Sequence, residues 1–322
     1  MHLSYVARIV CLLLIGWAVL QTLGDVLAWT IAPWLERLSA PNARTKERRL
    51  FWLLLAARAF PLLLATCFLL PSYVLGEDNH APEEVGWLTM LAAALVALWW
   101  MANLVRQGMA IERTRRSVAK CPTVGQTQTG LPILLYPGKK PLLALTGIFA
   151  PRILLSRKLM EPAWCSPEAL NVALEHEIAH ARHHDNLKLL LISLPHLRIA
   201  TKACPSLEQR WRLAAELASD EESVCGQPQR SILLAEMLVR MARGYQEDHP
   251  QASIAFLSRA EDLRVRVDRL LQMSQPVFEG TNHERAARNT WAISAVMASA
   301  ALLAYLCIGF GHAFAELIFQ LN

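Results

Sequence analysis

The sequence predicts a mainly α-helical membrane protein, with about four transmembrane helices and an α+β domain on the cytoplasmic side. Hydrophobic residues make up 54% of the 322-residue chain, and its mean hydropathy of +0.27 is too high for an ordinary soluble enzyme. Long apolar stretches lie near both ends, and shorter patterned segments lie between them. We therefore expect a membrane bundle at 1–108, a cytoplasmic domain at 109–288, and a last span with a short outside tail at 289–322.

Each predicted span is an apolar stretch that approaches or exceeds the roughly 20 residues needed to cross a bilayer. The first is interpreted as a retained span, because no small-residue signal-peptide cleavage site follows it. Within it, Asp25 is expected to face other helices or the membrane interface. Arg58 in the second span is expected either to pair inside the bundle or to extend to the headgroups. The spans are expected at residues 9–34, 50–74, 86–105 and 291–310.

The positions of lysine and arginine predict the orientation, because these residues favour cytoplasmic loops. They gather between the first two spans and after the third. The basic residues in question are Arg37, Arg44, Lys46, Arg48, Arg49, Arg106, Arg113, Arg115, Arg116 and Lys120. The segment 76–84 between the second and third spans is acidic and contains neither type, so it is expected outside, as is the N-terminus. The net charge of +5 then indicates contact with anionic membrane lipid and no direct nucleic-acid binding.

Short apolar runs separated by proline and glycine open the cytoplasmic domain and predict a small sheet. These runs are residues 131–136, 141–145 and 152–156. We expect the last of them to be an exposed sheet edge, where an extended peptide could bind as an additional strand. The residues of this predicted substrate-binding edge are Ile153, Leu154, Leu155 and Ser156.

The central motif is H-E-x-x-H at His176–His180, on a helix expected to begin near Ser166. Ser166 is a suitable N-cap, and Pro167 suits the first helical position. Histidines four residues apart lie on one helical face, so both rings can bind one ion, which is usually zinc. Glu177 is the candidate general base that takes a proton from the attacking water. The motif fixes three positions only, and chance alone would produce it in on the order of one such chain in a hundred.

A catalytic zinc normally has three protein ligands and an open position, so a third ligand is needed. His184 is a poor candidate, because it lies about 12 Å along the helix axis from His176 at 1.5 Å per residue. Glu216, in a later helical segment, is a better one. Asp220 shares the helical face of Glu216 and is expected to accept a hydrogen bond from the free ring nitrogen of a ligand histidine. The sequence thus predicts one zinc ion held by both motif histidines and Glu216.

Other common kinds of site are not indicated. The seven cysteines contain no C-x-x-C pair, which argues against a disulfide framework or a cysteine zinc site. We find no glycine-rich phosphate loop and no setting that would activate a serine or cysteine nucleophile.

The two-part motif resembles the BlaR/MecR family of integral-membrane metallopeptidases, relatives of the HtpX and CAAX prenyl protease family. In that family H-E-x-x-H runs into basic residues and an aspartate, as residues 182–185 do here, and a later segment reads E-x-x-C-D-E. This chain has E-L-A-S-D-E at Glu216–Glu221, so Ser219 replaces the cysteine at a position that is not thought to bind metal. The segment 147–156 is similar to the strand that precedes the active-site helix in the family. Spans and domain together extend the resemblance over most of the chain.

The resemblance implies a zincin-like (gluzincin) fold for the domain and a multi-pass zinc endopeptidase of the bacterial inner membrane. The implied substrate is a cytoplasmic protein, a winged-helix transcriptional repressor, cleaved when a signal reaches the membrane part. Self-cleavage and a homodimer are further expectations. A penicillin-binding sensor domain often follows the last span in this family, whereas only residues 311–322 follow it here, so direct sensing of β-lactams is not expected.

Two other functions stay open at this point. An HtpX-like protease that degrades damaged membrane proteins would carry the same motif. A non-enzymatic membrane signalling scaffold with a relic motif is less favoured, because ligands, base and supporting acid are all present. The E-L-A-S-D-E segment and the strand after Pro151 are closer to the BlaR/MecR pattern than to HtpX, which favours regulation.

Overall fold

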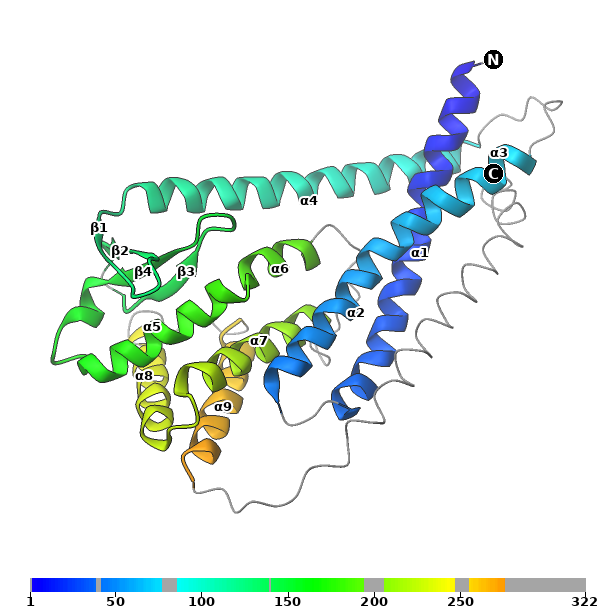
Figure 1. Cartoon of the computed structure of the whole chain (residues 1–322). Coiled ribbons are helices and arrows are strands. Elements are labelled where there is room, and N and C mark those ends of the chain that lie inside the picture. Colours follow the sequence, from blue (N-terminus) through cyan, green and yellow to red (C-terminus); the bar gives the residue numbers. More distant parts are fainter. Residues whose placement is uncertain are drawn as a thin grey trace.

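The computed structural model describes residues 2–38, 42–76, 86–138, 140–193, 206–246 and 255–275. This part of the chain is mostly helical and contains one small sheet, which agrees with the predicted mainly α-helical class. Long helices extend to one side of a domain of shorter helices and strands (Figure 1). The fourth predicted span at 291–310 lies outside the described residues.

Among the described residues, three helices are long and apolar enough to cross a membrane. Helices α1 (His2–Leu38) and α4 (Trp87–Ala119) are continuous, whereas α2 (Ala43–Leu64) leads through a π-helical segment, Ala65–Leu69, into α3 (Leu70–Gly76). The candidate spans are Tyr5–Arg37, Ala43–Val74 and Trp87–Ala119. They include the first three predicted spans, and many of their large apolar side chains are exposed on the protein surface, as lipid contact requires.

The π-helical segment precedes Pro71, whose ring would clash with the carbonyl group four residues earlier in a regular α-helix. The wider turn therefore lets the second span continue past a residue that would otherwise interrupt it.

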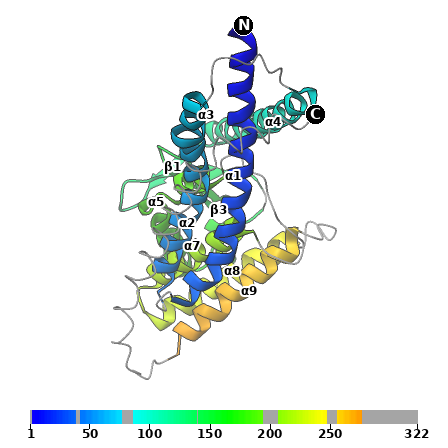
Figure 2. The same ribbon diagram turned by 90° about the vertical axis from the view of Figure 1, so that its right-hand side faces the viewer.

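Helices α1 and α2 lie side by side, while α4 meets α1 near one end and extends over the sheet at the other (Figures 1 and 2). The rings of Trp17 and Trp100 pack edge to face at the α1–α4 contact, with centroids 6.2 Å apart. Because α4 continues to Ala119, the expected domain boundary at residues 108 and 109 falls inside a helix. Membrane part and domain are thus joined by continuous helix here.

The two charged residues predicted inside the first two spans contact each other. Asp25 of α1 and Arg58 of α2 are both buried and form an ion pair. Arg58 Nε also donates a 3.4 Å hydrogen bond to the carbonyl oxygen of Ile192. Of the two alternatives for Arg58, the structure therefore has pairing inside the bundle.

The sheet has the strand order β1–β2–β4–β3. Its strands are β1 (Thr123–Gln126), β2 (Pro132–Tyr136), β3 (Leu143–Thr146) and β4 (Arg152–Ser156). Strand β4 pairs parallel with β2 and antiparallel with β3.

The predicted substrate-binding edge is therefore wrong, because β4 is an inner strand. Ile153, Leu154 and Leu155 pair with residues of both neighbouring strands, and Ser156 pairs with Tyr136 of β2 and donates its N–H to Leu142 O. Burial explains this position: Ile153, Leu155 and Ser156 are at most 4% exposed, and an unbroken apolar run is typical of a strand covered on both faces. The strand at the edge beside the histidines is β3.

A short 3-10 helix at Arg157–Met160 and five further helices complete the domain: α5 (Pro167–Arg182), α6 (Asp185–Ile192), α7 (Leu207–Val224), α8 (Pro228–Gln246) and α9 (Ala255–Met273). As predicted, the first of them begins after Ser166, whose hydroxyl accepts a 3.2 Å hydrogen bond from Ala169 N. It ends before His184, which has the left-handed φ of 55° and turns the chain into α6. The turn at His184 therefore divides residues 167–192 into two helices, α5 and α6.

Two apolar cores hold these elements together. One packs the sheet residue Leu155 against α5, α8 and α9, through side chains such as Val172, Leu234 and Leu270. The other packs α1 and α2 against α6 and α7, with Leu54, Ile192 and Trp211 each at most 2% exposed. The second core means that α1 and α2 are part of the packing around the helices that carry the predicted site.

Candidate metal centre

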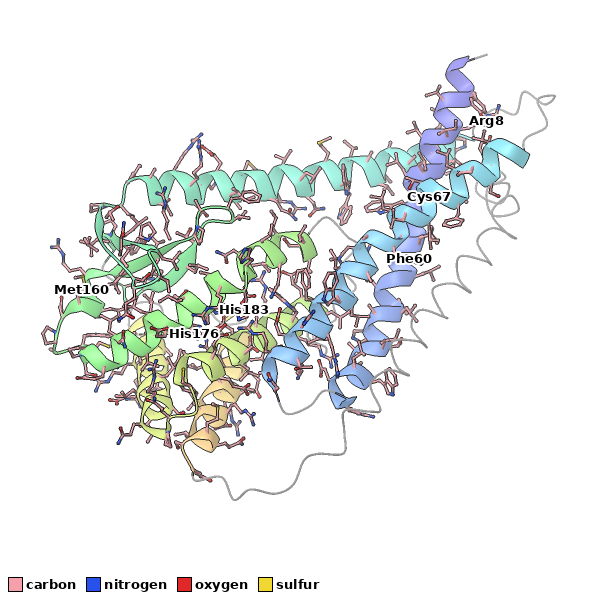
Figure 3. All side chains as sticks on the ribbon, viewed as in Figure 1. Arg8, Phe60, Cys67, Met160, His176 and His183 are labelled. Atoms are coloured by element: carbon pink, nitrogen blue, oxygen red, sulfur yellow. The ribbon has the colours of Figure 1, made fainter. Side chains whose placement is uncertain are left out.

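The two motif histidines lie one turn apart on α5 and face the same way, as the spacing predicts. Figure 3 shows His176 inside the domain, where α5 passes close to α7. The two ring centroids are 4.7 Å apart, and the Nε2 atoms of His176 and His180 are 3.1 Å apart. Both rings are largely buried, so the two nitrogens are presented together at one point.

Glu216 completes the group from α7. Its carboxylate oxygens lie 3.4 Å from His176 Nε2 and 3.7 Å from His180 Nε2. Helix α7 is held in place at its start by a capping box, in which Ser206 and Gln209 each bond the other's backbone N–H. The three side chains form a group that could hold a metal ion, with ligand atoms within 4.8 Å of one another.

The spacing of these atoms fits a small four-coordinate ion. Tetrahedral zinc with bonds of about 2.0–2.1 Å needs its ligand atoms roughly 3.3 Å apart. The two Nε2 atoms are 3.1 Å apart, one Glu216 oxygen lies 3.4 Å from His176 Nε2, and the other Glu216 oxygen lies 3.7 Å from His180 Nε2. Two imidazoles and a carboxylate suit zinc and also other divalent transition metals. The geometry therefore supports a divalent metal site without selecting the ion.

Each histidine has a carboxylate next to its other ring nitrogen. His180 Nδ1 is 2.8 Å from Asp185 Oδ2, and His176 Nδ1 is 2.9 Å from Asp220 Oδ1, although its N–H direction is poorly aligned for a hydrogen bond. A carboxylate at Nδ1 favours the tautomer that carries its proton there. In their neutral forms both rings would then present Nε2 lone pairs to each other and to Glu216, an arrangement that a cation between them would stabilise.

The predicted partner Asp220 thus lies at the ring of His176, whereas Asp185, the partner of His180, was not predicted to have a role. The aspartate was visible as the end of the basic stretch 182–185. What could not be read from sequence was the sharp turn at His184, which brings the first residue of α6 back to His180.

Arg266 of α9 is the second residue that the sequence analysis did not identify. Its guanidinium donates two 2.8 Å hydrogen bonds to Asp220 and lies 2.7 Å from Glu216 Oε2. Burial alone would raise the pKa of Glu216, but Arg266 and the two histidines hold that pKa well below its ordinary value. Arg266 therefore keeps both acids ionised. Only the fold could identify it, since it lies on a helix with several other arginines.

The pocket around the histidines stabilises positive charge. Burial alone would lower the pKa of His180, but hydrogen bonds with Asp185 and Glu216 raise that pKa to about 10. Burial likewise opposes a rise in the pKa of His176, which the Asp220 and Glu216 carboxylates produce. A cation at the same point would benefit from the same carboxylates.

Glu177, the predicted base, faces strand β3. Its Oε2 accepts a 2.6 Å hydrogen bond from Leu145 N, and both residues line a cleft of about 360 Å³ that also contains the three ligand candidates. The cleft is also lined by the neighbouring β3 residues Leu143 and Ala144. Apolar residues of α6 and α8, such as Leu189, Leu234 and Met241, line it as well. The carboxylate is therefore anchored on one oxygen at the wall of a cleft whose lining combines apolar residues with charged ones such as Arg212 and Arg266.

His183 and His184 lie at the end of α5 away from this group, which agrees with the rejection of His184 as a third ligand. His183 Nε2 is 2.8 Å from Glu222 Oε2 of α7, and Arg182 also pairs with Glu222. His184 Nδ1 lies 3.2 Å from the carbonyl oxygen of Arg182. Among the described residues, neither histidine belongs to the possible metal-binding group.

Comparison with known proteins found no relative from which a function could be transferred. No family model matches the sequence, and neither a curated protein nor a solved structure matches it.

Proposed function

We propose that this protein is a zinc endopeptidase of the bacterial inner membrane that cleaves a cytoplasmic protein, a transcriptional repressor, in response to a signal. The observation that carries the proposal is the convergence of His176, His180 and Glu216 beside Glu177 at one cleft. Three candidate spans attached to this domain support a membrane location. The resemblance of the two-part motif to the BlaR/MecR family supports the regulatory role.

The proposed reaction follows from the positions of the side chains. A bound zinc ion would polarise the scissile carbonyl and lower the pKa of water. Glu177 accepts the proton of the attacking water and delivers it to the leaving amine, as a general base and then acid. The hydrogen bond from Leu145 N fixes one oxygen of this carboxylate and so aims the other. Asp185 and Asp220 keep the imidazoles oriented, and Arg266 balances the charge of Asp220 and Glu216.

The cleft favours an extended substrate with apolar side chains. Residues Leu143–Leu145 of β3 form its wall, and β3 is the sheet edge nearest the ligands. An extended peptide could add to this edge by main-chain hydrogen bonds to groups other than those of Leu145, whose N–H donates to Glu177 and whose carbonyl oxygen lies 3.4 Å from Asn186 Nδ2. Leu234, Met237 and Met241 of α8 would then contact its side chains.

Replacing Glu177 with Gln tests the chemistry. The amide keeps the size of the side chain but cannot accept the proton, so we expect the variant to bind about one zinc per chain and to lose peptide cleavage by about 10²-fold or more. Zinc content by metal analysis and generation of new N-termini in vivo are the measurements. Full cleavage by the variant would contradict the role of Glu177.

A membrane-protein quality-control protease is the alternative that one observation favours. Helices α6 and α7, which line the cleft, pack directly against α1 and α2, so the cleft is close to candidate spans. Proteomes of cells with wild-type protein and with Glu177→Gln distinguish the two. One cleaved DNA-binding protein supports regulation, many membrane-protein fragments support quality control, and no difference supports a non-enzymatic scaffold.

A further inference from the structure

A buried acid on the candidate span α2 is connected to the metal-binding group. Glu47 lies in the juxtamembrane stretch 44–49, which otherwise carries mainly basic residues, and it is only 1% exposed. Its Oε1 accepts hydrogen bonds from Lys188 Nζ and Trp211 Nε1, both 3.0 Å long. A buried carboxylate needs such partners, so its position is set by residues of α6 and α7.

The contact continues from Lys188 to the histidine. Lys188 Nζ also donates a 3.0 Å hydrogen bond to Asp185 Oδ1, and the second oxygen of Asp185 lies 2.8 Å from His180 Nδ1. Glu47, Lys188 and Asp185 therefore form a continuous chain of charged groups from α2 to a candidate metal ligand. Asp185 is 6% exposed, so water screens little of this chain at its inner end.

Helix α6 is attached to α2 at both ends. Near its start Lys188 bonds Glu47 and lies over the ring of Phe51, with Nζ 5.8 Å from the centroid. At its end the Ile192 carbonyl accepts the hydrogen bond from Arg58. A shift of α2 would consequently move α6, and with it the carboxylate that orients His180.

We propose that Glu47 is a positioning residue of the metal centre, which it serves by holding Lys188 and, through it, Asp185 against His180. This inference rests on the proposed function only in that the group must bind metal. It assigns the candidate span α2 a part in building the site. It also gives a physical route from the span to the metal centre. A signal molecule could act along this route if it binds one arrangement of α2 more tightly than another.

The test is a titration of the purified full-length protein in detergent with zinc alone. Replacing Asp185 with Asn should weaken zinc binding by roughly 10- to 100-fold, the usual effect of losing a partner of a ligand histidine. Glu47→Gln and Lys188→Met should each weaken it by about 3- to 10-fold, less because they act through Asp185. The double variant should be no weaker than the worse single one, since both changes break one chain.

Glu221→Gln is the matched control. Glu221 Oε2 accepts a 3.1 Å hydrogen bond from Ala43 N, so it also joins α2 to α7, but its contact does not lead to His180. Zinc affinity of this variant should stay within about twofold of the wild type. In protein loaded with cobalt, the visible absorption bands should shift for Glu47→Gln and stay unchanged for Glu221→Gln. A general loss of stability would not produce this difference between the two variants.

Several results would overturn the inference. One is an unchanged zinc affinity in both Glu47→Gln and Lys188→Met. Another is a loss of zinc affinity in the Glu221→Gln control equal to that in Glu47→Gln. If Glu47→Gln does not fold, the double variant Glu47→Gln with Lys188→Met decides, because it removes both members of the buried pair and leaves neither as an uncompensated charge. A wild-type protein that binds no zinc would overturn the metal centre as well, whereas a protein that binds zinc but cleaves nothing would contradict only the proposed protease.

Discussion

Replacing Arg266 removes the positive charge that pairs with both Asp220 and Glu216 at the candidate metal centre. Arg266→Gln leaves Asp220, which is 1% exposed, and Glu216 without their shared cation. We expect a loss of about 3 kcal/mol in the free energy of unfolding of the zinc-free protein, the scale found when one partner of a buried ion pair is removed. With zinc the loss should be smaller, because the ion supplies positive charge to Glu216. Denaturant unfolding with and without zinc measures both.

Arg264→Gln is the control for that experiment. Arg264 lies on the same helix with a 74% exposed side chain, 3.8 Å from the carboxylate of Asp268. Exposed pairs of this kind contribute at most about 0.5 kcal/mol. Equal losses in the two variants would show that Arg266 does not stabilise the buried acids.

The contacts of Glu222 with His183 and Arg182 join α7 to α5, and we expect their contribution to stability to depend on pH. Burial would raise the pKa of Glu222, but His183 and Arg182 lower that pKa below its ordinary value. A carboxyl with a lowered folded pKa stabilises the fold above its unfolded pKa and loses this contribution as pH falls through the folded pKa. Because the side chain is 29% exposed, we expect only about 0.5 kcal/mol at neutral pH.

The measurement compares wild type with Glu222→Gln. The wild type should be more stable at neutral pH, and the difference should disappear in acid below the folded pKa. A difference that grew on acidification would contradict the assigned direction.

At the scale of elements, the ion pair between Asp25 and Arg58 connects α1 to α2 inside the bundle. Asp25→Asn removes the carboxylate and leaves the charge of Arg58 in a buried position. We expect a loss of about 3 kcal/mol, seen as a lower unfolding midpoint in detergent. The double variant Asp25→Leu with Arg58→Met should be less destabilised than Asp25→Asn, because it leaves no buried charge behind. A double variant as unstable as the single one would argue against this account.

For the whole molecule, the distribution of basic residues predicts that the metal domain faces the cytoplasm. Cys225 is exposed at the end of α7 and suits a labelling test in a variant whose other six cysteines are replaced. We expect it to react with a membrane-impermeant maleimide only after cells are permeabilised. Asn79→Cys, in the acidic segment predicted outside, should react in intact cells. Labelling of Cys225 from outside would reverse the orientation.

Local patterns in the sequence were sufficient for several elements because their causes are local. Apolar length predicts the first three candidate spans, and Ser166 with Pro167 predicts the start of α5. The four-residue spacing brings the histidine rings together for the same reason, since helix geometry alone places them on one face.

The strand order and the remaining site residues depend on contacts between distant segments, which local patterns do not specify. Residues 153–156 have the composition of a strand, but the partners that made β4 an inner strand come from two other parts of the chain. Arg266 carries no local sign that distinguishes it from Arg264 two residues earlier, and only the packing of α9 against α7 directs it to Asp220.

The sequence by itself thus determined that this is a largely helical chain with apolar spans, a histidine pair on one helix and an acid pair, Glu216 and Asp220, on another. Tertiary structure alone decided that these two helices bring the histidine nitrogens and the Glu216 oxygens within 3.1 to 3.7 Å, and that Glu47 of a candidate span is connected to this group through Lys188 and Asp185. The physical reason is the sequence distance over which each effect acts. Helix periodicity and the length of an apolar stretch depend on residues within one segment, whereas a metal centre requires distant segments to be packed against each other in the folded cores.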